Sequence, residues 1–167
     1  MNVTFKVPAM IAGLFIAGSA LALNPGDRVD NFRLLDQAGA SHELYYLSDA
    51  RVVVLMTYGN GCGIVQKSLP RLREIRAQYK AKGIEFLLFD SNLQDTRDSV
   101  AKESSAFGND LPILIDATQL VGEALGVDRT ADIFVVDPKN WTLVYHGPMA
   151  CRSALRQFRR RSLDIER

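Results

Sequence analysis

The sequence predicts a single α/β domain built on a mixed β-sheet, and three observations support this fold class. Short apolar, β-branched segments alternate along the chain with longer segments whose apolar residues recur at helical spacing. The continuous apolar runs at 52–58 (VVVLMTY) and 84–90 (IEFLLFD) are typical of strands buried on both faces. The chain of 167 residues is 47% hydrophobic and 23% charged, which suits one domain and excludes general disorder and a coiled coil.

The order of the elements implies a central sheet that is flanked by helices and preceded by an N-terminal β-hairpin. Turn residues at 37–40 join the strands of that hairpin, and glycines end two of the helices. Pro70 is expected to kink the first long helix. In chain order we expect a hairpin at 31–36 and 41–47, a strand at 52–58, a helix at 64–82, a strand at 84–90, a surface helix at 95–103 capped by Asp95 or Thr96, a strand at 113–116, a helix at 118–125, a hairpin at 133–137 and 142–146, and an Arg-rich helix at 153–163.

The first 22 residues have the pattern of an export signal. One positive charge, on Lys6, precedes a mostly apolar stretch at 7–21, and Ala20-Leu21-Ala22 fits the A-x-A cleavage pattern. The sequence therefore predicts a signal peptide at 1–22, a mature domain at 23–167 and a periplasmic or secreted location. The alternative is an uncleaved anchor, although the stretch is short for a membrane span of ~20 residues. Membrane contact is then expected only through this segment.

Composition and motifs exclude several classes of function. A net charge of +1 provides no global basic field for nucleic acid. Two histidines are too few for a multi-histidine metal site, and two cysteines are too few for a disulfide scaffold. No phosphate-binding loop, dinucleotide fingerprint, nucleophile elbow or zinc-ligand spacing is present. We therefore expect no cofactor, no metal and no nucleic-acid partner, so any chemistry must come from a few side chains.

Cys62 is the main candidate for a reactive residue. It lies in the glycine-rich break GNGCG (59–63) between a buried strand and a predicted helix. The unpaired amides and partial positive charge of a helix N-terminus favour the thiolate, which is the reactive form of cysteine. Gly59, Gly61 and Gly63 are expected to leave the sulfur sterically open. Tyr58 and Asn60 flank the loop and are expected to shape its pocket. The alternative is a buried, inert cysteine.

The same stretches resemble the redoxin group of the thioredoxin fold, which includes alkyl hydroperoxide reductase, thiol-specific antioxidant and peroxiredoxin-like proteins. The resemblance is carried by the strand and helix around Cys62, by the strand at 83–92, by RTADIFVVD at 129–137 and by the Y-x-G motif at 145–147. It covers roughly residues 25–160. The resemblance implies a thioredoxin-like domain at 23–167 with an active-site loop facing the stretch that begins at Arg129.

Three residues of that facing stretch are candidates for the site. Arg129, which lies just before the late strand, is expected to steady a thiolate or sulfenate through charge-assisted hydrogen bonds. The alternative is a surface arginine at a loop end. Thr130 and Ala131 are expected to complete the active-site loop, with Ala131 where thioredoxin-like proteins usually place a cis proline. Three further positions depart from the family: Gly63 replaces a common proline, Val65 leaves no C-x-x-C pair, and Gly59 replaces the peroxiredoxin threonine.

Cys151 is the second candidate thiol, and its role depends on the implied topology. In a thioredoxin-like sheet the final strand, here 142–146, runs parallel to the strand that precedes Cys62. Both strands then end at the same edge of the sheet, which places Cys151 near Cys62 as a resolving cysteine. The cysteine Cα atoms would have to approach within ~7 Å for a disulfide. The alternative is an unpaired cysteine at a helix start.

Two functional hypotheses follow. The first is an exported thiol oxidoreductase in which Cys62 attacks a small peroxide or a disulfide of a protein partner, with Cys151 resolving the product. The second is a non-catalytic module that binds a partner protein, favoured by Gly63 and Ala131, or one that binds Cu(I) through the two cysteines, His146 and Met149.

Overall fold

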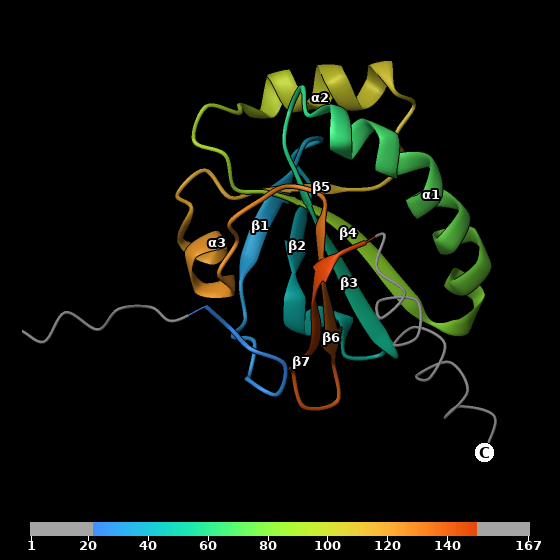
Figure 1. Ribbon diagram of the computed structural model, residues 1–167, viewed down its shortest axis with the longest axis vertical. Helices are drawn as coiled ribbons and strands as arrows, with labels where there is room; N and C mark the ends of the chain where they lie inside the picture. Colours follow the sequence, from blue (N-terminus) through green and yellow to red (C-terminus); the bar gives the residue numbers. More distant parts are fainter. Residues whose placement is uncertain (1–21, 150–167) are drawn as a thin grey trace, which may run out of the picture.

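The computed structural model describes residues 22–149 (Figure 1). The signal peptide at 1–22 falls almost wholly outside the described residues, as do Cys151 and the helix expected at 153–163. The expected α/β architecture is present in the described part, with a seven-stranded mixed sheet and helices packed against it.

The sheet has the strand order β2-β1-β5-β4-β3-β6-β7. Strands β3, β4 and β5 are mutually parallel at the centre, whereas β1, β2, β6 and β7 join through antiparallel pairs. Because β7 is antiparallel to β6 and β6 is antiparallel to β3, β7 runs parallel to β3, as expected. The strands are β1 (Arg33–Asp36), β2 (Ser41–Glu43), β3 (Val52–Tyr58), β4 (Ile84–Asp90), β5 (Ile113–Ile115), β6 (Asp132–Asp137) and β7 (Thr142–Pro148).

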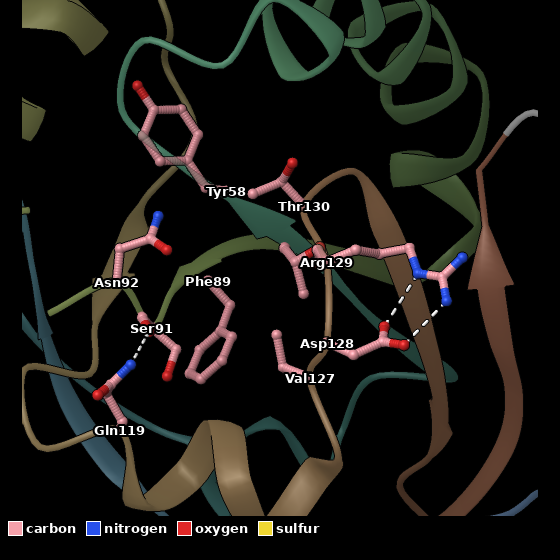
Figure 2. Close-up of a pocket in the computed structure, with 10 residues that line it drawn as sticks. Tyr58, Phe89, Ser91, Asn92, Gln119, Val127, Asp128, Arg129 and Thr130 are labelled. Carbon is pink, nitrogen blue, oxygen red and sulfur yellow. Dashed lines mark hydrogen bonds and ion pairs between the residues drawn. The ribbon is translucent and has the colours of Figure 1, made fainter.

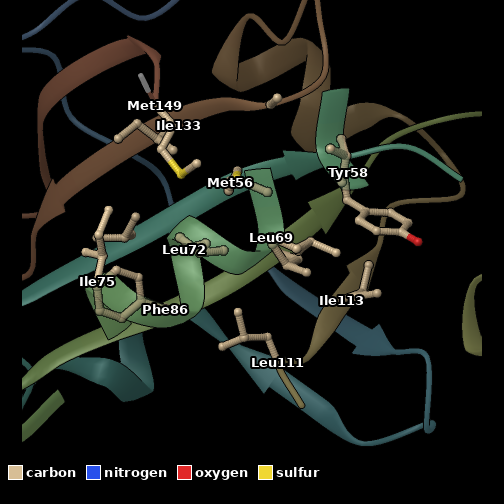
Figure 3. Packing of buried hydrophobic residues seen from close by; sticks show 14 of the residues in the cluster. Met56, Tyr58, Leu69, Leu72, Ile75, Phe86, Leu111, Ile113, Ile133 and Met149 are labelled. Atoms are coloured by element: carbon tan, nitrogen blue, oxygen red, sulfur yellow. The ribbon is translucent and has the colours of Figure 1, made fainter. Parts of the chain in front are cut away.

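Alternating side chains of the central strands divide the core into two layers. One layer packs against α1 (Gly63–Tyr79) and α2 (Arg97–Ala106), with Leu69, Leu72 and Ile75 of α1 facing β3 and β4 (Figure 3). The other layer packs against α3 (Leu120–Leu125) and the 3-10 helix η1 (Leu44–Leu47). This two-sided burial explains why β3 and β4 are continuously apolar, and it fixes the edge at which both strands end.

The structure differs from the expected elements at a few boundaries. The second hairpin strand ends at Glu43 because the next amides bond elsewhere: Leu44 N–H donates to Phe32 O (3.0 Å) and Tyr45 N–H to Asn31 Oδ1 (3.0 Å). The chain there forms η1 instead of a longer strand.

The helices also end or begin slightly differently from the expected ranges. Helix α1 continues through Pro70 to Tyr79, and η2 (Lys80–Lys82) replaces its expected last turn before Gly83 adopts a left-handed conformation (φ 76°). Thr96, and not Asp95, caps α2 by accepting a hydrogen bond from Ser99 N–H. Within residues 22–149, no helix combines the length and apolar character needed to cross a membrane.

Candidate active site

Cys62 is the N-cap residue of α1, directly after the loop that leaves β3. Its side chain is partly exposed and carries a free thiol. The hydroxyl of Thr130 lowers the pKa of the Cys62 thiol, and the backbone amides of Val65 and Ile64 lower it further. Burial and the charge of Glu103 act in the opposite direction. The net shift favours the thiolate, as expected for a cysteine at a helix N-terminus.

Thr130 is the residue that reaches the sulfur from across the sheet edge. Its Oγ1 lies 3.1 Å from Cys62 Sγ. Gly59 makes this approach possible, because a Cβ at position 59 would lie 2.8 Å from Thr130 Cγ2 and 2.8 Å from Asn92 Nδ2. The glycine found in place of the peroxiredoxin threonine therefore leaves room for a threonine that comes from a different segment.

Thr57, on β3, holds the segment that carries Thr130. Its Oγ1 lies 2.9 Å from Arg129 O and accepts a hydrogen bond from Asp132 N–H at 3.0 Å. Its backbone carbonyl accepts the N–H of Ala131 at 2.9 Å. Because Thr57 is 2% exposed, these bonds form away from water and fix the segment against β3. Thr57 was not identified from the sequence, because it lies within the apolar run at 52–58 and no local pattern distinguishes it from its neighbours.

Ala131 occupies the position where related folds usually place a cis proline. In the described residues no peptide bond is cis, and Ala131 has a left-handed backbone (φ 62°). Its N–H donates to Thr57, a bond that proline cannot make. The segment thus uses a left-handed alanine where the family uses proline.

A cavity of about 330 Å³ opens beside Thr130 (Figure 2). Its wall is mostly polar, and the buried ring of Phe89 forms part of its lining. Gln119 is held there by a hydrogen bond from its Nε2 to Ser91 O at 2.9 Å. Since Thr130 both lines the cavity and contacts Cys62, the cavity lies next to the thiol. The lining residues are Thr57, Tyr58, Phe89, Ser91, Asn92, Gln119, Val127, Asp128, Arg129 and Thr130.

Arg129 lines the cavity, but its guanidinium bonds to carboxylates and not to the thiol. Its Nε and Nη2 donate to Asp128 at 3.0 and 2.8 Å, and Nε lies 3.7 Å from Asp132 Oδ2. The side chain is 61% exposed, and in Figure 2 it extends away from Thr130. The structure therefore places Arg129 at the site without the contact to Cys62 that the sequence analysis expected.

Two carboxylates from the segment around α2 hold the loop that precedes Cys62. Asp95 Oδ2 accepts a hydrogen bond from Asn60 N–H (3.0 Å), and Glu103 Oε2 accepts one from Gly61 N–H (2.6 Å). The sequence analysis treated Asp95 as a helix-capping residue and did not identify Glu103. No local pattern reveals these contacts, because they join residues 35 and 42 positions apart.

Tyr58 and Gly63 occupy opposite sides of the loop. The side chain of Tyr58 is 3% exposed and packs in the layer below α1 (Figure 3), and burial is the main reason that its pKa is raised. Gly63 is exposed at the start of α1, with no atom within 4 Å of the place where a Cβ would lie. The start of α1, next to the thiol, is therefore sterically open.

The histidine and methionine of the Cu(I) hypothesis lie in different layers of the core. The His146 ring stacks on Phe134 with 4.1 Å between ring centroids, on the α3 side of the sheet. Met149 packs in the layer below α1 (Figure 3), which is the cluster against which Cys62 also packs. The residues at 22–149 contain no group of three or more histidine, cysteine or acidic side chains that could hold a metal ion.

A central parallel β3-α1-β4 unit, with a cysteine at the start of α1 and a facing segment before β6, defines a thioredoxin-like protein. The Redoxin family model matches residues 24–147, and the chain belongs to that family.

A curated relative points in the same direction. The chain is 29% identical over 112 residues to the thiol-disulfide oxidoreductase ResA of Bacillus thuringiensis (strain Al Hakam). That match covers 67% of this chain and 63% of the relative, so the chain spans less than two thirds of its length.

Solved structures confirm the fold. A putative thiol:disulfide interchange protein DsbE from Chlorobium tepidum superposes with a TM-score of 0.72 at 21% identity, covering 85% of this chain and 99% of the other. Peroxidoxin BcpB from Mycobacterium tuberculosis superposes with a TM-score of 0.69 at 21% identity, covering 84% of this chain and 97% of the other. The thioredoxin-like fold expected from the sequence is therefore confirmed.

Proposed function

We propose that this protein is an exported thiol-disulfide oxidoreductase that uses Cys62 as its nucleophile. The observation that carries the proposal is the environment of the sulfur: Cys62 caps α1, contacts the Thr130 hydroxyl at 3.1 Å and has a lowered pKa. Similarity to a protein named as a thiol-disulfide oxidoreductase supports the choice of substrate class. The export signal expected at 1–22 supports an extracytoplasmic location.

In the proposed reaction, the Cys62 thiolate attacks one sulfur of a substrate disulfide. A Cys62–substrate disulfide forms, and the other substrate sulfur leaves as a thiolate. A second thiol then attacks Cys62 Sγ of the mixed disulfide, and the substrate sulfur that was bound to Cys62 leaves as a thiolate. The substrate disulfide is thereby reduced by two electrons, and Cys62 and the second thiol are oxidised to a disulfide. Cys151 is the proposed second thiol, because β7 ends at the same edge of the sheet as β3, and because Met149 and Cys62 both pack in the layer below α1.

The cavity beside Thr130 gives this reaction a place for the substrate. Its polar wall, including Asn92 and Gln119, offers hydrogen-bonding groups for the peptide that flanks a disulfide. We assign Arg129 to this wall as a residue that contacts substrate. It does not hold the thiolate, because its guanidinium donates to Asp128.

Trapping of the mixed disulfide tests the proposal. The mature chain is incubated with glutathione disulfide at neutral pH and analysed by peptide mass spectrometry without reductant. We expect a glutathione adduct on Cys62 in Cys151→Ser, a Cys62–Cys151 disulfide in the wild type, and neither product in Cys62→Ser. Absence of any product on Cys62 would exclude the proposed exchange.

A parallel sample with stoichiometric hydrogen peroxide separates exchange from peroxide reduction. Peroxide would oxidise Cys62 to a sulfenic acid, which condenses with a thiol to a disulfide and water. Faster oxidation by peroxide than by glutathione disulfide would replace the proposed substrate with a peroxide.

A further inference from the structure

Glu103 is joined to the chain on both sides of Cys62. One carboxylate oxygen accepts the Gly61 N–H at 2.6 Å, and the other accepts Gln66 Nε2 at 3.0 Å. Gly61 immediately precedes Cys62, and Gln66 N–H closes the first turn of α1 by donating to Cys62 O at 3.0 Å. A single side chain of α2 therefore bridges the loop and the first helical turn that together carry the thiol.

The loop is closed by one backbone hydrogen bond of its own, from Cys62 N–H to Gly59 O at 3.1 Å, and the Gly61 amide is bonded to Glu103. Gly61 is exposed and has a left-handed backbone (φ 73°), and no atom lies within 4 Å of the place where its Cβ would be. Asp95 holds the neighbouring Asn60 through a backbone amide at 3.0 Å. Hydrogen bonds to a carboxylate, such as these, are stronger than bonds between neutral groups. They therefore hold the backbone of the loop in one conformation.

A negatively charged carboxylate near Cys62 disfavours the thiolate, which is the form that a reactive cysteine needs. The charge of Glu103 raises the pKa of Cys62 and so disfavours the thiolate. The other titratable groups that interact with Glu103 are Tyr58 on β3, which also hydrogen-bonds to it, and Asp90 on β4, and neither supplies positive charge. Electrostatic activation of the thiol therefore does not explain the residue, whereas its bonds to Gly61 and Gln66 do.

We propose that Glu103 is a positioning residue for Cys62, which fixes the angle at which the sulfur meets its substrate by joining the Gly61 amide to the first turn of α1. The inference rests on the proposed function in one respect, since it takes Cys62 as the attacking thiol. On this proposal, α2 contributes no reacting group but holds the active-site loop in shape through Glu103.

Two substitutions at position 103 separate the bonds of the side chain from its charge. Glu103→Gln removes the charge and keeps an oxygen that can accept the Gly61 N–H, while its new NH2 group can donate to Gln66 Oε1 once the Gln66 amide turns over. Glu103→Ala removes the charge and both bonds. Asp98→Asn is the matched control, because it removes a charge from an exposed side chain of the same helix. Each protein is compared by amide hydrogen exchange, by iodoacetamide alkylation of Cys62 against pH, and by reaction with glutathione disulfide above the alkylation midpoint.

We expect both Glu103 variants to shift the alkylation midpoint to lower pH, because both remove the charge that raises the Cys62 pKa. Only Glu103→Ala is expected to speed exchange of the Gly61 amide and to slow the disulfide reaction, each by about tenfold. Glu103→Gln should stay within about twofold of the wild type in both, and Asp98→Asn should match the wild type throughout.

Two results would overturn the inference. One is unchanged Gly61 exchange and disulfide reactivity in Glu103→Ala. The other is faster exchange of amides across the whole sheet, which would mean that Glu103 serves only global stability. If the wild type fails to react with glutathione disulfide, the proposed function is wrong, and the Gly61 exchange of the two variants still decides whether Glu103 holds the loop.

Discussion

The hydroxyl of Thr130 lies 3.1 Å from the sulfur of Cys62, although the two residues are 68 positions apart in the chain. This contact is the largest cause of the lowered pKa of Cys62. It depends on two features of β3 and its loop: Thr57 fixes the segment before β6, and Gly59 leaves space for the Thr130 methyl group. The surroundings of the Cys62 thiol are thus formed jointly by the segments before α1 and before β6.

Removal of the Thr130 hydroxyl should make Cys62 less reactive. Thr130→Val keeps the shape of the side chain but cannot donate to a thiolate, so the pKa of Cys62 should rise towards that of an ordinary cysteine. At a pH below the midpoint, iodoacetamide alkylation should slow by roughly three- to tenfold, allowing for solvent screening at a partly exposed site. Thr142→Val, at the far end of β7, is the control and should react like the wild type. Equal alkylation profiles for Thr130→Val and the wild type would show that the contact does not activate the thiol.

Alanine should have opposite effects at the two glycines on either side of the loop. In Gly59→Ala the new Cβ would lie 2.8 Å from Thr130 Cγ2, so the segment must shift, and we expect a loss of about 1–3 kcal/mol in the free energy of unfolding. In Gly63→Ala the Cβ meets open space at the start of α1, and we expect a change from zero to a gain of about 1 kcal/mol. Urea denaturation measures both. Equal stability of the two variants would mean that the approach of Thr130 imposes no packing constraint.

The periodicity of the sequence predicted the α/β class with a mixed sheet and the position of Cys62 at a helix start, whereas the thioredoxin-like fold was predicted from the resemblance of the motifs to the redoxin group. The apolar runs of β3 and β4 record burial on both faces, and the glycine-rich break followed by a helical pattern indicates a cysteine at a helix start. Both features depend on residues that are close together in the chain, which is why they could be predicted from the sequence.

The partners of Cys62 are not local properties. The contacts of Thr130 and Glu103 depend on which way side chains turn once β6 and α2 have packed, and a threonine or glutamate at these positions has no distinctive spacing. Arg129 shows the reverse case: it lines the cavity beside Thr130, but the neighbouring Asp128, and not Cys62, binds its guanidinium.

Restoring the proline that the family usually carries should damage this protein. Ala131 has a φ of 62° and donates its N–H to Thr57 O, and proline can adopt neither feature. We expect Ala131→Pro to lower the free energy of unfolding by about 3 kcal/mol or more. Ala131→Gly, which accepts a left-handed backbone without strain, should be neutral or stabilising by up to about 1 kcal/mol. A stable, fully active Ala131→Pro would show that the segment readily adopts the usual family conformation.

Asp90 should make the protein less stable as the pH rises. It is 1% exposed, and burial, aided by the charges of Asp95 and Glu103, raises its pKa to about 7. One oxygen accepts Asn92 N–H at 3.0 Å, whereas Oδ2 is buried without a hydrogen-bond partner in the described structure. Because the folded state holds this proton more tightly than the unfolded state does, the contribution of Asp90 is fully present below about pH 4 and is lost as the pH rises to about 7.

Asp90→Asn tests this linkage, because an amide keeps the acceptor for Asn92 and can donate to the carboxylates as a protonated acid would. We expect the variant to exceed the wild type in stability at pH 8 by up to about 4 kcal/mol and to approach it at pH 4. Urea denaturation of both proteins across this range measures the difference. The titration of groups that do not interact with Asp90 cancels from it, whereas Asp95 and Glu103, which interact with Asp90, contribute to it. Asp98→Asn, exposed on α2, should follow the wild type at every pH. A constant difference between Asp90→Asn and the wild type would mean that Asp90 ionises equally in the folded and unfolded chains.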